Sequence, residues 1–403
     1  MRIVHLTDHY QPWMGYQESY LPQEQQRIGH DVSVITSNRY AKKAKKLIEG
    51  GNPKPGTYFE QGVKVHRLPV WFELPTQAGY LLMRGLRDQL AAIKPDVVHC
   101  HNILHITGFL AALYQQELGY ALVYDTHMSK LNVFHAWESP LRKQIKAWVY
   151  KLEAWMTRPW IPKRAKLFVA IGEPEREFVE WVYGKSCPKV EIVRLGADHR
   201  KIDFQWQGRQ KIRAALGWDE NTIVLGHAGV LQPSKQCEMI LQAAAQLQSE
   251  NTGILLIGRI DSEYKEKLVK LSRSLGLEQK LVFQDFVSKD ELAGWLSTFD
   301  IGIWPGDMTI TIIEAMAAGR PVIAVRTPYS QALIEDVGAG YLFEKNQQEE
   351  LNRLVQAFVF EPEMRSVIGQ RSRSAVELHW NWEVIADQFV GLYQQAIEEN
   401  RKG

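Results

Sequence analysis

The sequence has few cysteines, no long apolar run and almost no net charge, and each shortage excludes a class of protein. Cys100, Cys187 and Cys237 lie far apart and form no Cys-x-x-Cys pair. This spacing argues against a disulfide framework and against a zinc site, and it fits the reducing cytosol. No apolar run approaches the roughly 18 residues that a membrane span needs. The formal charge of +2 gives no reason to expect a nucleic-acid partner.

What the sequence does have is the composition of a globular protein with two or three domains. Of its 403 residues, 45% are hydrophobic and 23% are charged, which argues against a largely disordered chain. Residues 1–10 hold one arginine, a short apolar run and then polar residues, which indicates a strand rather than a signal peptide. We therefore expect a cytoplasmic protein.

Short apolar runs rich in valine and isoleucine recur along the chain, with helical stretches between several of them. Runs that are apolar at successive positions are typical of strands buried on both faces of a parallel sheet. Their alternation with helices indicates repeated βα units. The expected strands are residues 3–6, 32–35, 63–68, 97–99, 121–124, 167–170, 191–194, 223–226, 254–257, 281–283, 301–304, 321–325 and 341–343.

The chain divides into two halves at residues 199–212, a polar and basic stretch without strand periodicity that suits a linker. The sequence therefore predicts an α/β fold of two Rossmann-like, doubly wound domains, residues 1–200 and 201–380, that face an interdomain cleft. Ligands of such sheets bind beyond the carboxyl ends of the strands.

The end of the chain is expected to form one more amphipathic helix, over residues 381–399. Its apolar positions follow helical spacing and are Ile385, Phe389, Leu392 and Ala396. A long terminal helix of this kind can pack back on the N-terminal domain, so residues 381–403 are assigned to it as a possible addition.

Two stretches place glycine where a phosphate-bearing ligand would need it. In the loop after the first strand, Gly15 lets backbone amides approach a ligand, and a helix N-terminus follows. In the second half, residues 226–235 lead from a strand into a helix. Gly226 and Gly229 lie next to the strand end and Lys235 is expected about one turn into the helix, which suits a diphosphate. The ordinary alternatives are a plain βα turn and a solvated lysine at a helix start.

A third stretch, residues 304–322, runs from a strand through a Pro-Gly turn into a helix that Gly319 ends. Glu314 lies within this otherwise apolar helix. A carboxylate in such surroundings needs partners, which are either the hydroxyl groups of a ribose or the cation of a buried ion pair.

Several motifs occur in a characteristic order. After the glycine loop come GHDVSVIT at residues 29–36, PDVVHCH at 95–101, IGE at 171–173, LGAD at 195–198 and IEAMAAGRPVI at 313–323. Together, over nearly the whole chain, they resemble the retaining glycosyltransferases of family four, the glycosyl transferases group 1, which have the GT-B fold.

The resemblance implies an N-terminal domain for the acceptor and a C-terminal domain for a nucleotide-sugar donor such as a UDP- or GDP-sugar. It implies retention at the anomeric carbon, with no required metal and no further cofactor. The acceptor is expected to be a sugar or a lipid-linked molecule in glycan or glycolipid biosynthesis. The donor base is expected near Phe286, with backbone and apolar contacts that do not identify it.

The resemblance also assigns roles to individual positions. Gly15 would lie beside the donor diphosphate, and His127, at the end of a strand, would face the transferred sugar. Lys235 would pair with the diphosphate and Glu314 would hold the ribose. Backbone amides for the diphosphate and the sugar would come from the loop of Gly306, Asp307, Met308 and Thr309.

Two positions depart from the family pattern. The family has two glutamates eight positions apart, and the first position here holds Gly306, with Asp307 beside it as a candidate substitute. The family's arginine before the lysine is Val230 here, so one cation for the diphosphate is missing. Arg259 and Arg194 are the candidates to replace it.

The expected mechanism follows from the charges that develop during transfer. Breaking the bond at the sugar C1 leaves positive charge on the sugar and negative charge on the leaving diphosphate. Without a metal, Lys235 and helix N-terminal amides must stabilise the diphosphate. No carboxylate pair presents itself as nucleophile and acid, so we hypothesise front-face substitution in which the leaving phosphate helps to take the acceptor proton.

His99, His101, His105 and His127 are expected near one sheet edge, which raises the question of a metal site. Alternation along a strand puts His99 and His101 on one face. Zinc sites favour tight motifs with several ligands, however, and the resembling family requires no metal. We therefore expect no metal here.

Residues 140–166 are basic and rich in tryptophan, with the single acid Glu153. The apolar positions follow helical spacing and are Ile145, Trp148, Val149, Leu152, Trp155 and Met156. One interpretation is a helix on the anionic inner face of a membrane, which favours a lipid-linked acceptor. The other is an ordinary helix whose aromatic stripe packs into the core. A second basic cluster consists of Lys42, Lys43, Lys45 and Lys46.

Two other functions stay open at this point. A nucleotide-sugar 2-epimerase shares the architecture but needs extra acid and base carboxylates in the cleft. A degenerate transferase that binds a nucleotide sugar without catalysis would fit Gly306 and Val230.

Overall fold

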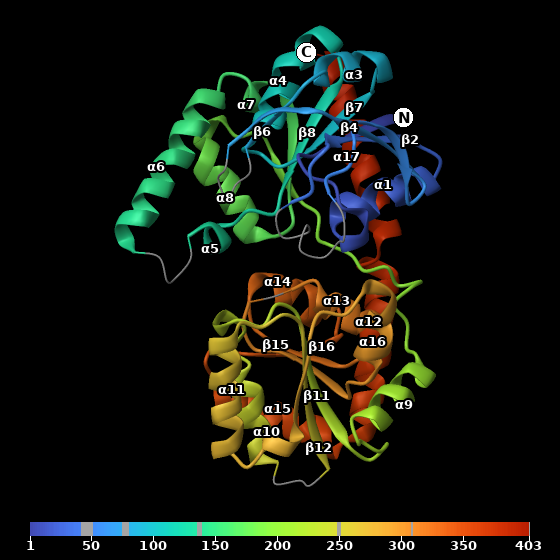
Figure 1. The fold of residues 1–403 in the computed structure, drawn as a ribbon, viewed down its shortest axis with the longest axis vertical. Coiled ribbons are helices and arrows are strands. Elements are labelled where there is room, and N and C mark those ends of the chain that lie inside the picture. The colour runs from blue at the N-terminus through green and yellow to red at the C-terminus, as the bar shows by residue number, and fades with distance from the viewer. Residues whose placement is uncertain (42–50, 75–79, 135–138, 248–250, 308, 403) are drawn as a thin grey trace. The chain divides into compact units, whose positions relative to one another are not determined.

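The chain forms two compact units, each built on one sheet (Figure 1). The computed structural model describes residues 1–41, 51–74, 80–134, 139–247, 251–307 and 309–402. Unit 1 consists of Met1–Arg194 and Trp382–Gly403, and unit 2 consists of Leu195–Asn381. The chain therefore leaves unit 1 once and returns to it for its last helix.

Unit 1 contains an eight-stranded sheet in the order β10-β9-β8-β7-β1-β2-β4-β3, parallel except for β3. A separate antiparallel pair, β5 and β6, follows β4. The strands are β1 (Arg2–Leu6), β2 (Asp31–Ser37), β3 (Gly56–Glu60), β4 (Val63–Leu68), β5 (Val70–Glu73), β6 (Leu81–Met83), β7 (Val97–His101), β8 (Ala121–Thr126), β9 (Ala165–Ala170) and β10 (Val190–Ile192).

The apolar runs predict the buried strands of this sheet but not its edge. Strands β3, β5 and β6 were not expected, and β10 lies slightly earlier than the run at 191–194. β3 is the edge strand and its residues are largely exposed, so it has no continuous apolar run to reveal it. β3 pairs with β4 across the turn at Gln61 and Gly62, both of which have positive φ.

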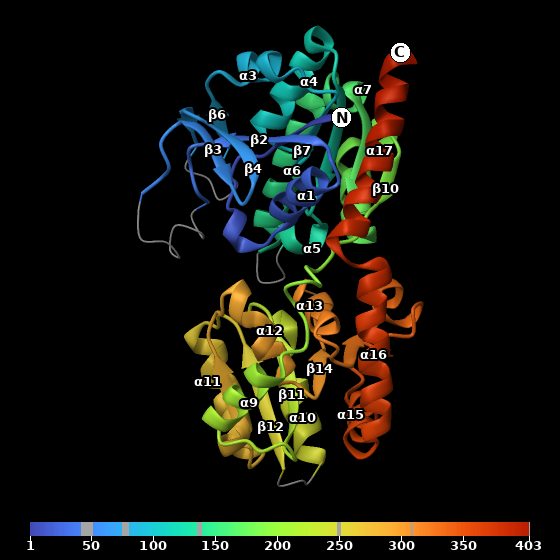
Figure 2. The same ribbon diagram turned by 90° about the vertical axis from the view of Figure 1, so that its right-hand side faces the viewer.

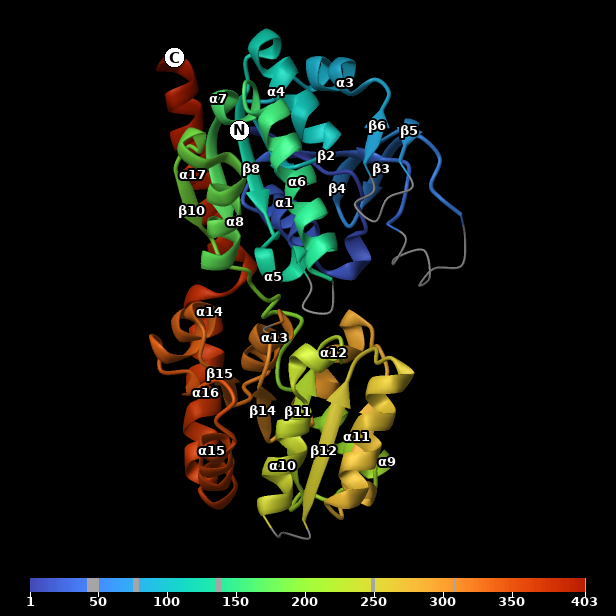
Figure 3. The ribbon, with the colours of Figure 1, turned by 90° about the vertical axis from the view of Figure 1, so that its left-hand side faces the viewer.

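Helices cover both faces of the unit 1 sheet (Figures 2 and 3). They are α1 (Gln17–Arg27), α3 (Leu86–Ile93), α4 (Ile106–Leu118), α5 (Lys130–Val133), α6 (Pro140–Thr157), α7 (Ile161–Arg164), α8 (Glu173–Tyr183) and α17 (Trp382–Lys402). α17 packs against α1, β7, β8 and β9. Its buried residues include Ile385, Phe389, Tyr393 and Ala396, whereas Leu392 is half-buried.

Unit 2 contains a six-stranded, entirely parallel sheet in the order β13-β12-β11-β14-β15-β16. The strands are β11 (Ile223–Ala228), β12 (Thr252–Ile257), β13 (Leu281–Gln284), β14 (Ile301–Trp304), β15 (Val322–Val325) and β16 (Gly340–Phe343). All six coincide with apolar runs. Successive residues of β12 alternate between two apolar cores, one on each face of the sheet, as expected of strands buried on both faces.

The unit 2 sheet also carries helices on both faces (Figure 1). They are α9 (Trp206–Ala215), α10 (Glu238–Gln246), α11 (Ser262–Ser274), α12 (Lys289–Ser297), α13 (Thr311–Ala317), α14 (Pro328–Ser330), α15 (Gln348–Phe360) and α16 (Pro362–His379).

The linker expected over residues 199–212 is wrong in its second part, where α9 begins at Trp206. The buried side chains of α9 are Arg209 and Arg213 rather than apolar residues. Both guanidinium groups pair with Asp300, at 2.8 Å and 3.1 Å. A helix that buries arginines lacks the apolar stripe by which amphipathic helices are recognised, so its sequence looks like a polar linker.

Gly226 in β11 gives a test of the unit 2 packing. A Cβ at this position would overlap the buried ring of Phe299, so we expect Gly226→Ala to lower the free energy of unfolding by about 2–3 kcal/mol. The matched control is Gly294→Ala in α12, whose added Cβ would make only ordinary contacts. Because alanine favours a helix, we expect the control to be neutral or stabilising by up to about 1 kcal/mol. Equal effects in chemical denaturation would contradict the packing described.

Candidate functional site

The candidate site of unit 2 lies where its strand order reverses. In the sheet, β11 has β12 on one side and β14 on the other, so the strands that follow β11 in sequence lie on both sides of it. Ligands of open parallel sheets bind at such a point. The backbone is crowded here, because a Cβ on Gly258 would collide with the carbonyl oxygen of Gly229. A Cβ on Gly229 would come 3.1 Å from the methyl group of Thr309. The loops after β11, β12 and β14 therefore touch one another.

Lys235 lies in this group as a buried cation. It ends the short 3-10 helix Pro233–Lys235 and is 5% exposed, and its ammonium donates a hydrogen bond to the carbonyl oxygen of Asp307 at 2.7 Å. Burial lowers the pKa of Lys235 from its usual value, against the opposing effect of Asp307. The expected lysine is therefore held inside the site rather than solvated at a helix start.

Gly306 stands where the family that the sequence resembles has its first glutamate, and the structure gives a physical reason for glycine. A Cβ there would collide with the carbonyl oxygen of Ser234 and the backbone of Lys235. The next amide, that of Asp307, donates to the same Ser234 carbonyl at 3.0 Å. The loop after β14 thus lies directly on the turn that carries Lys235, and any side chain at 306 would force the two apart.

Thr309 and Trp304 fix the far end of this loop. The indole Nε1 of Trp304 lies 3.2 Å from the hydroxyl group of Thr309, and both groups approach the carbonyl oxygen of Ala228 at the end of β11. Met308, also expected in the site, lies outside the described residues.

Glu314 forms a buried ion pair, which was one of the two kinds of partner expected for it. Its side chain is 2% exposed in the first turn of α13, and the ammonium of Lys289 bonds to one carboxylate oxygen. Lys289 was not among the residues expected in the site. It is the first residue of α12, which starts with a capping box at Ser288, and no local pattern connects that helix start to Glu314.

Arg259 and Phe286 lie together next to the loop after β12. The guanidinium carbon of Arg259 is 5.4 Å from the ring centroid of Phe286, and that ring is 54% exposed. Arg259 follows Gly258, which touches Gly229, so the pair belongs to the same edge of the sheet. Arg194, the other candidate cation, is the last residue of the first segment of unit 1, Met1–Arg194.

In unit 1, Gly15 and His127 are connected through Gln17, which was not among the expected site residues. Gly15 has φ 66° and ψ 42°, a left-handed conformation that suits glycine, and it ends the turn from which α1 begins. Gln17, the first residue of α1, places its Oε1 3.1 Å from Nε2 of His127. His127 follows directly after β8 and is half-buried.

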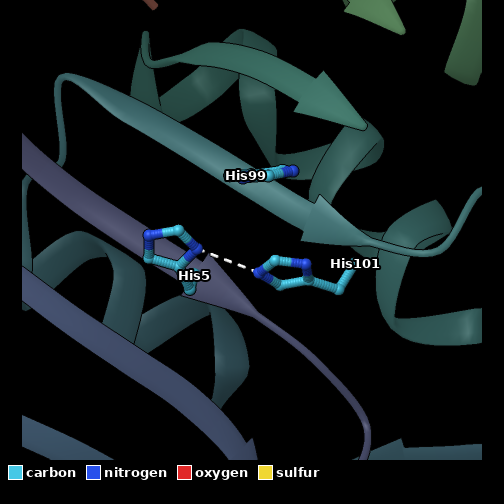
Figure 4. Close-up of side chains that lie close together, drawn as sticks. All are labelled: His5, His99 and His101. Carbon is cyan, nitrogen blue, oxygen red and sulfur yellow. Dashed lines mark hydrogen bonds between the residues drawn. The ribbon is translucent and has the colours of Figure 1, made fainter. Parts of the chain in front are cut away.

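Behind Gln17 lies a buried histidine network around one carboxylate. Oδ2 of Asp125 accepts hydrogen bonds from Nε2 of Gln17 and Nδ1 of His101, both at 2.8 Å. The same oxygen lies 3.2 Å from Nε2 of His99. Nε2 of His101 lies 2.9 Å from Nδ1 of His5, a contact between neighbouring strands (Figure 4).

Burial and pairing set the charges of this network. Burial lowers the pKa of His5 well below its usual value and that of His99 to about 4, so both rings are neutral near pH 7. Burial also disfavours charge on His101 and Asp125, but their attraction outweighs it: the pKa of His101 is raised and that of Asp125 is well below its usual value. The interior of unit 1 therefore holds a His101–Asp125 ion pair.

Ligand nitrogens of His5, His99 and His101 lie within 4.8 Å of one another, a spacing that a metal ion would fit. Protein groups already bond to these rings, however. Nε2 of His5 lies 2.7 Å from the side-chain oxygen of Gln25, and Nδ1 of His99 lies 2.6 Å from the hydroxyl group of Tyr393. A metal would have to displace these hydrogen bonds.

The basic, tryptophan-rich helix α6 lies on the outside of unit 1 (Figure 3). The side chains of its apolar stripe are exposed. Trp148 and Trp155 are 65% and 70% exposed, and the other exposed members are Leu141, Ile145, Val149, Leu152 and Met156. The face toward the protein includes Ala154, Thr157 and Glu153, which accepts a hydrogen bond from Tyr80. The interpretation that packs this stripe into the core is therefore wrong.

Two family profiles match this chain. Residues 19–196 match the profile described as glycosyl transferase 4-like domain, and residues 208–375 match the profile described as glycosyl transferases group 1. The first match lies in unit 1 apart from its last two residues, and the second lies in unit 2.

Similar proteins match over most of the chain. The D-inositol 3-phosphate glycosyltransferase of Rhodococcus erythropolis is 26% identical over 349 residues, which are 82% of this chain and 75% of that protein. The sucrose-phosphate synthase of Thermosynechococcus elongatus has a TM-score of 0.71 at 18% identity, over 99% of both chains. The Anabaena protein HepE, solved with UDP and glucose, has a TM-score of 0.70 at 17% identity, over 98% of this chain and 100% of its own. These two structural similarities concern the fold.

The ion pair of Glu314 and Lys289 generates a stability test. Because Lys289→Met would leave a buried carboxylate without its cation, we expect the free energy of unfolding to fall by about 2 kcal/mol. Lys289 is partly exposed, so the effect is smaller than for a fully buried pair. Adding Glu314→Gln should recover most of the loss, and Lys270→Met, at an exposed position of α11, should have little effect. Additive losses from the two site substitutions would contradict the pairing.

Proposed function

Because this chain belongs to the group 1 glycosyltransferases and has the GT-B fold, as its sequence predicted, we propose that it is a retaining enzyme that needs no metal ion. It transfers a sugar from a nucleotide-sugar donor. The proposal extends to the acceptor, which is a sugar on a lipid carrier at an anionic membrane surface. UDP-glucose is the first donor to test, since HepE was solved with UDP and glucose.

The observation that carries the donor proposal is the buried ammonium of Lys235 at the switch point of the unit 2 sheet. A leaving diphosphate gains negative charge during transfer, and a cation held in place beforehand stabilises that charge without reorganisation. Burial strengthens the interaction, because water screens it less. The loop at Gly306 and Asp307 lies against Lys235, so the backbone amides of this loop are the natural further donors to the diphosphate.

The remaining donor contacts follow from the same edge of the sheet. We assign the ribose to Glu314, whose carboxylate accepts hydrogen bonds from hydroxyl groups, and the base side to the exposed ring of Phe286. Arg259, stacked on that ring, is the candidate to replace the family arginine lost at Val230. The proposed step is front-face substitution at C1, with the leaving phosphate accepting the proton of the attacking hydroxyl group and His127 facing the sugar.

A donor panel with and without acceptors tests the reaction class. We expect a new glycoside with the anomeric configuration of the donor, formed equally well in the presence of EDTA. A 2-epimerised sugar without a glycoside would identify an epimerase instead, and binding without turnover would identify a degenerate protein. Nucleotide release measured by chromatography and product configuration measured by NMR distinguish these outcomes.

Lys235→Met tests the role of the buried ammonium. We expect kcat to fall by about 100-fold or more, because the leaving diphosphate loses a preorganised donor. Lys270→Met removes a cation from the exposed face of α11 and should leave kcat unchanged. If the Lys235→Met variant turned over substrate at a rate close to that of the unaltered enzyme, the proposed role of Lys235 would be wrong.

The membrane part of the proposal rests on the orientation of α6. Its exposed stripe repeats at helical spacing. The exposed cations Arg142 and Lys151 lie on the same helix, and Arg158 follows it directly. Apolar side chains between cations fit the boundary of an anionic bilayer, where each nearby cation contributes about 1 kcal/mol. Among the described residues no helix is long and apolar enough to cross a membrane. The second basic cluster, Lys42 to Lys46, lies outside the described residues.

Replacing Trp148 and Trp155 together by serine tests this surface. We expect co-sedimentation with phosphatidylglycerol-containing vesicles to weaken about tenfold or more, because two large apolar side chains are lost from the contact. Trp206→Ser, at a half-exposed tryptophan of α9, is the matched control. Equal binding to vesicles of phosphatidylcholine alone would contradict the anionic surface. A dimer that the same double substitution dissociates would assign the stripe to a second copy of the chain.

A further inference from the structure

The hydrogen bonds around Gln17 have only one consistent direction, and this fixes the position of a proton on His127. The carboxylate of Asp125 has no proton to donate, because burial, which raises its pKa, is outweighed by His101, and the pKa lies well below the usual value. The 2.8 Å contact between Gln17 and Asp125 is therefore made by the amide nitrogen of Gln17 as donor.

This orientation turns the amide oxygen of Gln17 toward His127. An amide oxygen only accepts hydrogen bonds, so Nε2 of His127, at 3.1 Å, must carry a proton. A neutral ring then has its lone pair on Nδ1. In the opposite tautomer, the unprotonated Nε2 of His127 would face the amide oxygen of Gln17, so two acceptors would meet. If the amide were turned over instead, its oxygen would face the Asp125 carboxylate, and two acceptors would meet there.

The supports of Gln17 are themselves fixed in the interior. Gln17 and Asp125 are each 2% exposed, and the same carboxylate oxygen is held by His101, which β7 carries next to β8. Gln17 is the first residue of α1, directly after the left-handed turn at Gly15. The turn at Gly15 therefore places the side chain of Gln17 at the end of β8, next to His127.

We propose that Gln17 and Asp125 are positioning residues that hold the His127 ring in one orientation with its proton on Nε2. The functional meaning rests on the proposed function, in which His127 faces the transferred sugar. The ring then meets the sugar as one defined tautomer, as oriented histidines do in catalytic sites whose second nitrogen bonds to a fixed group. Neither Gln17 nor Asp125 touches the reacting atoms in this proposal.

NMR of protein labelled with ¹⁵N-histidine tests the proposal on the complete chain. His127→Gln identifies the His127 signals. We expect the neutral His127 ring of the unaltered protein to carry its proton on Nε2 and none on Nδ1. A neutral His127 ring with its proton on Nδ1 and none on Nε2 would overturn the proposal. This measurement needs no mutation of Gln17, so the test does not depend on the folding of a variant.

Gln17→Leu then tests the contact itself. We expect the His127 signals to shift toward a mixture of tautomers and kcat to fall about tenfold, with KM for the donor changed by less than about twofold. Gln23→Leu is the matched control, since Gln23 lies on the same helix and its amide nitrogen donates to the Ser19 carbonyl one turn earlier and to the side chain of Gln61, away from His127. Unchanged His127 signals in Gln17→Leu would overturn the proposal.

The two proposals can fail separately. If no nucleotide sugar is turned over but His127 is protonated at Nε2 and responds to Gln17→Leu, the proposed function fails while the positioning stands. If sugar transfer occurs but the His127 tautomer does not depend on Gln17, the positioning fails alone.

Discussion

A charge taken out of water must find a partner, and this constraint organises both units of the protein. In unit 1 the carboxylate of Asp125 accepts hydrogen bonds from His101 and Gln17. In unit 2 Glu314 forms an ion pair with Lys289, and the ammonium of Lys235 donates to a backbone carbonyl oxygen. An unpartnered buried charge would cost several kcal/mol, whereas these groups are held in place by the bonds that compensate them. Each of these charges lies near the carboxyl ends of parallel strands, where the fold leaves room for a ligand.

Part of the fold could be read from the sequence because burial leaves a local signature. Every strand of the unit 2 sheet is an apolar run, since both faces of a parallel sheet are covered. The same logic fails where burial is not apolar. Helix α9 buries two arginines and looks like a linker, and the edge strand β3 is exposed and has no run at all. Helix α6 shows the opposite case, with a regular apolar stripe that faces outward.

The candidate site was predictable where one segment supplies both the motif and the chemistry. Lys235 follows a glycine turn, and Glu314 is conspicuous as the one acid in an apolar helix. The contributions of Lys289, Gln17 and His5 were not predicted, because each depends on contact with a residue far away in the sequence. The departure at Gly306 also needed the structure: its hydrogen atom is all that fits against the Ser234 carbonyl, so a glutamate there would require a different path of the loop.

A crystal structure of the protein with an intact or hydrolysed nucleotide sugar is the most direct test of the central claim. The account predicts diphosphate oxygens within hydrogen-bond distance of the Lys235 ammonium and ribose hydroxyl groups on the Glu314 carboxylate. A nucleotide bound elsewhere, with Lys235 still bonded only to protein groups, would contradict it.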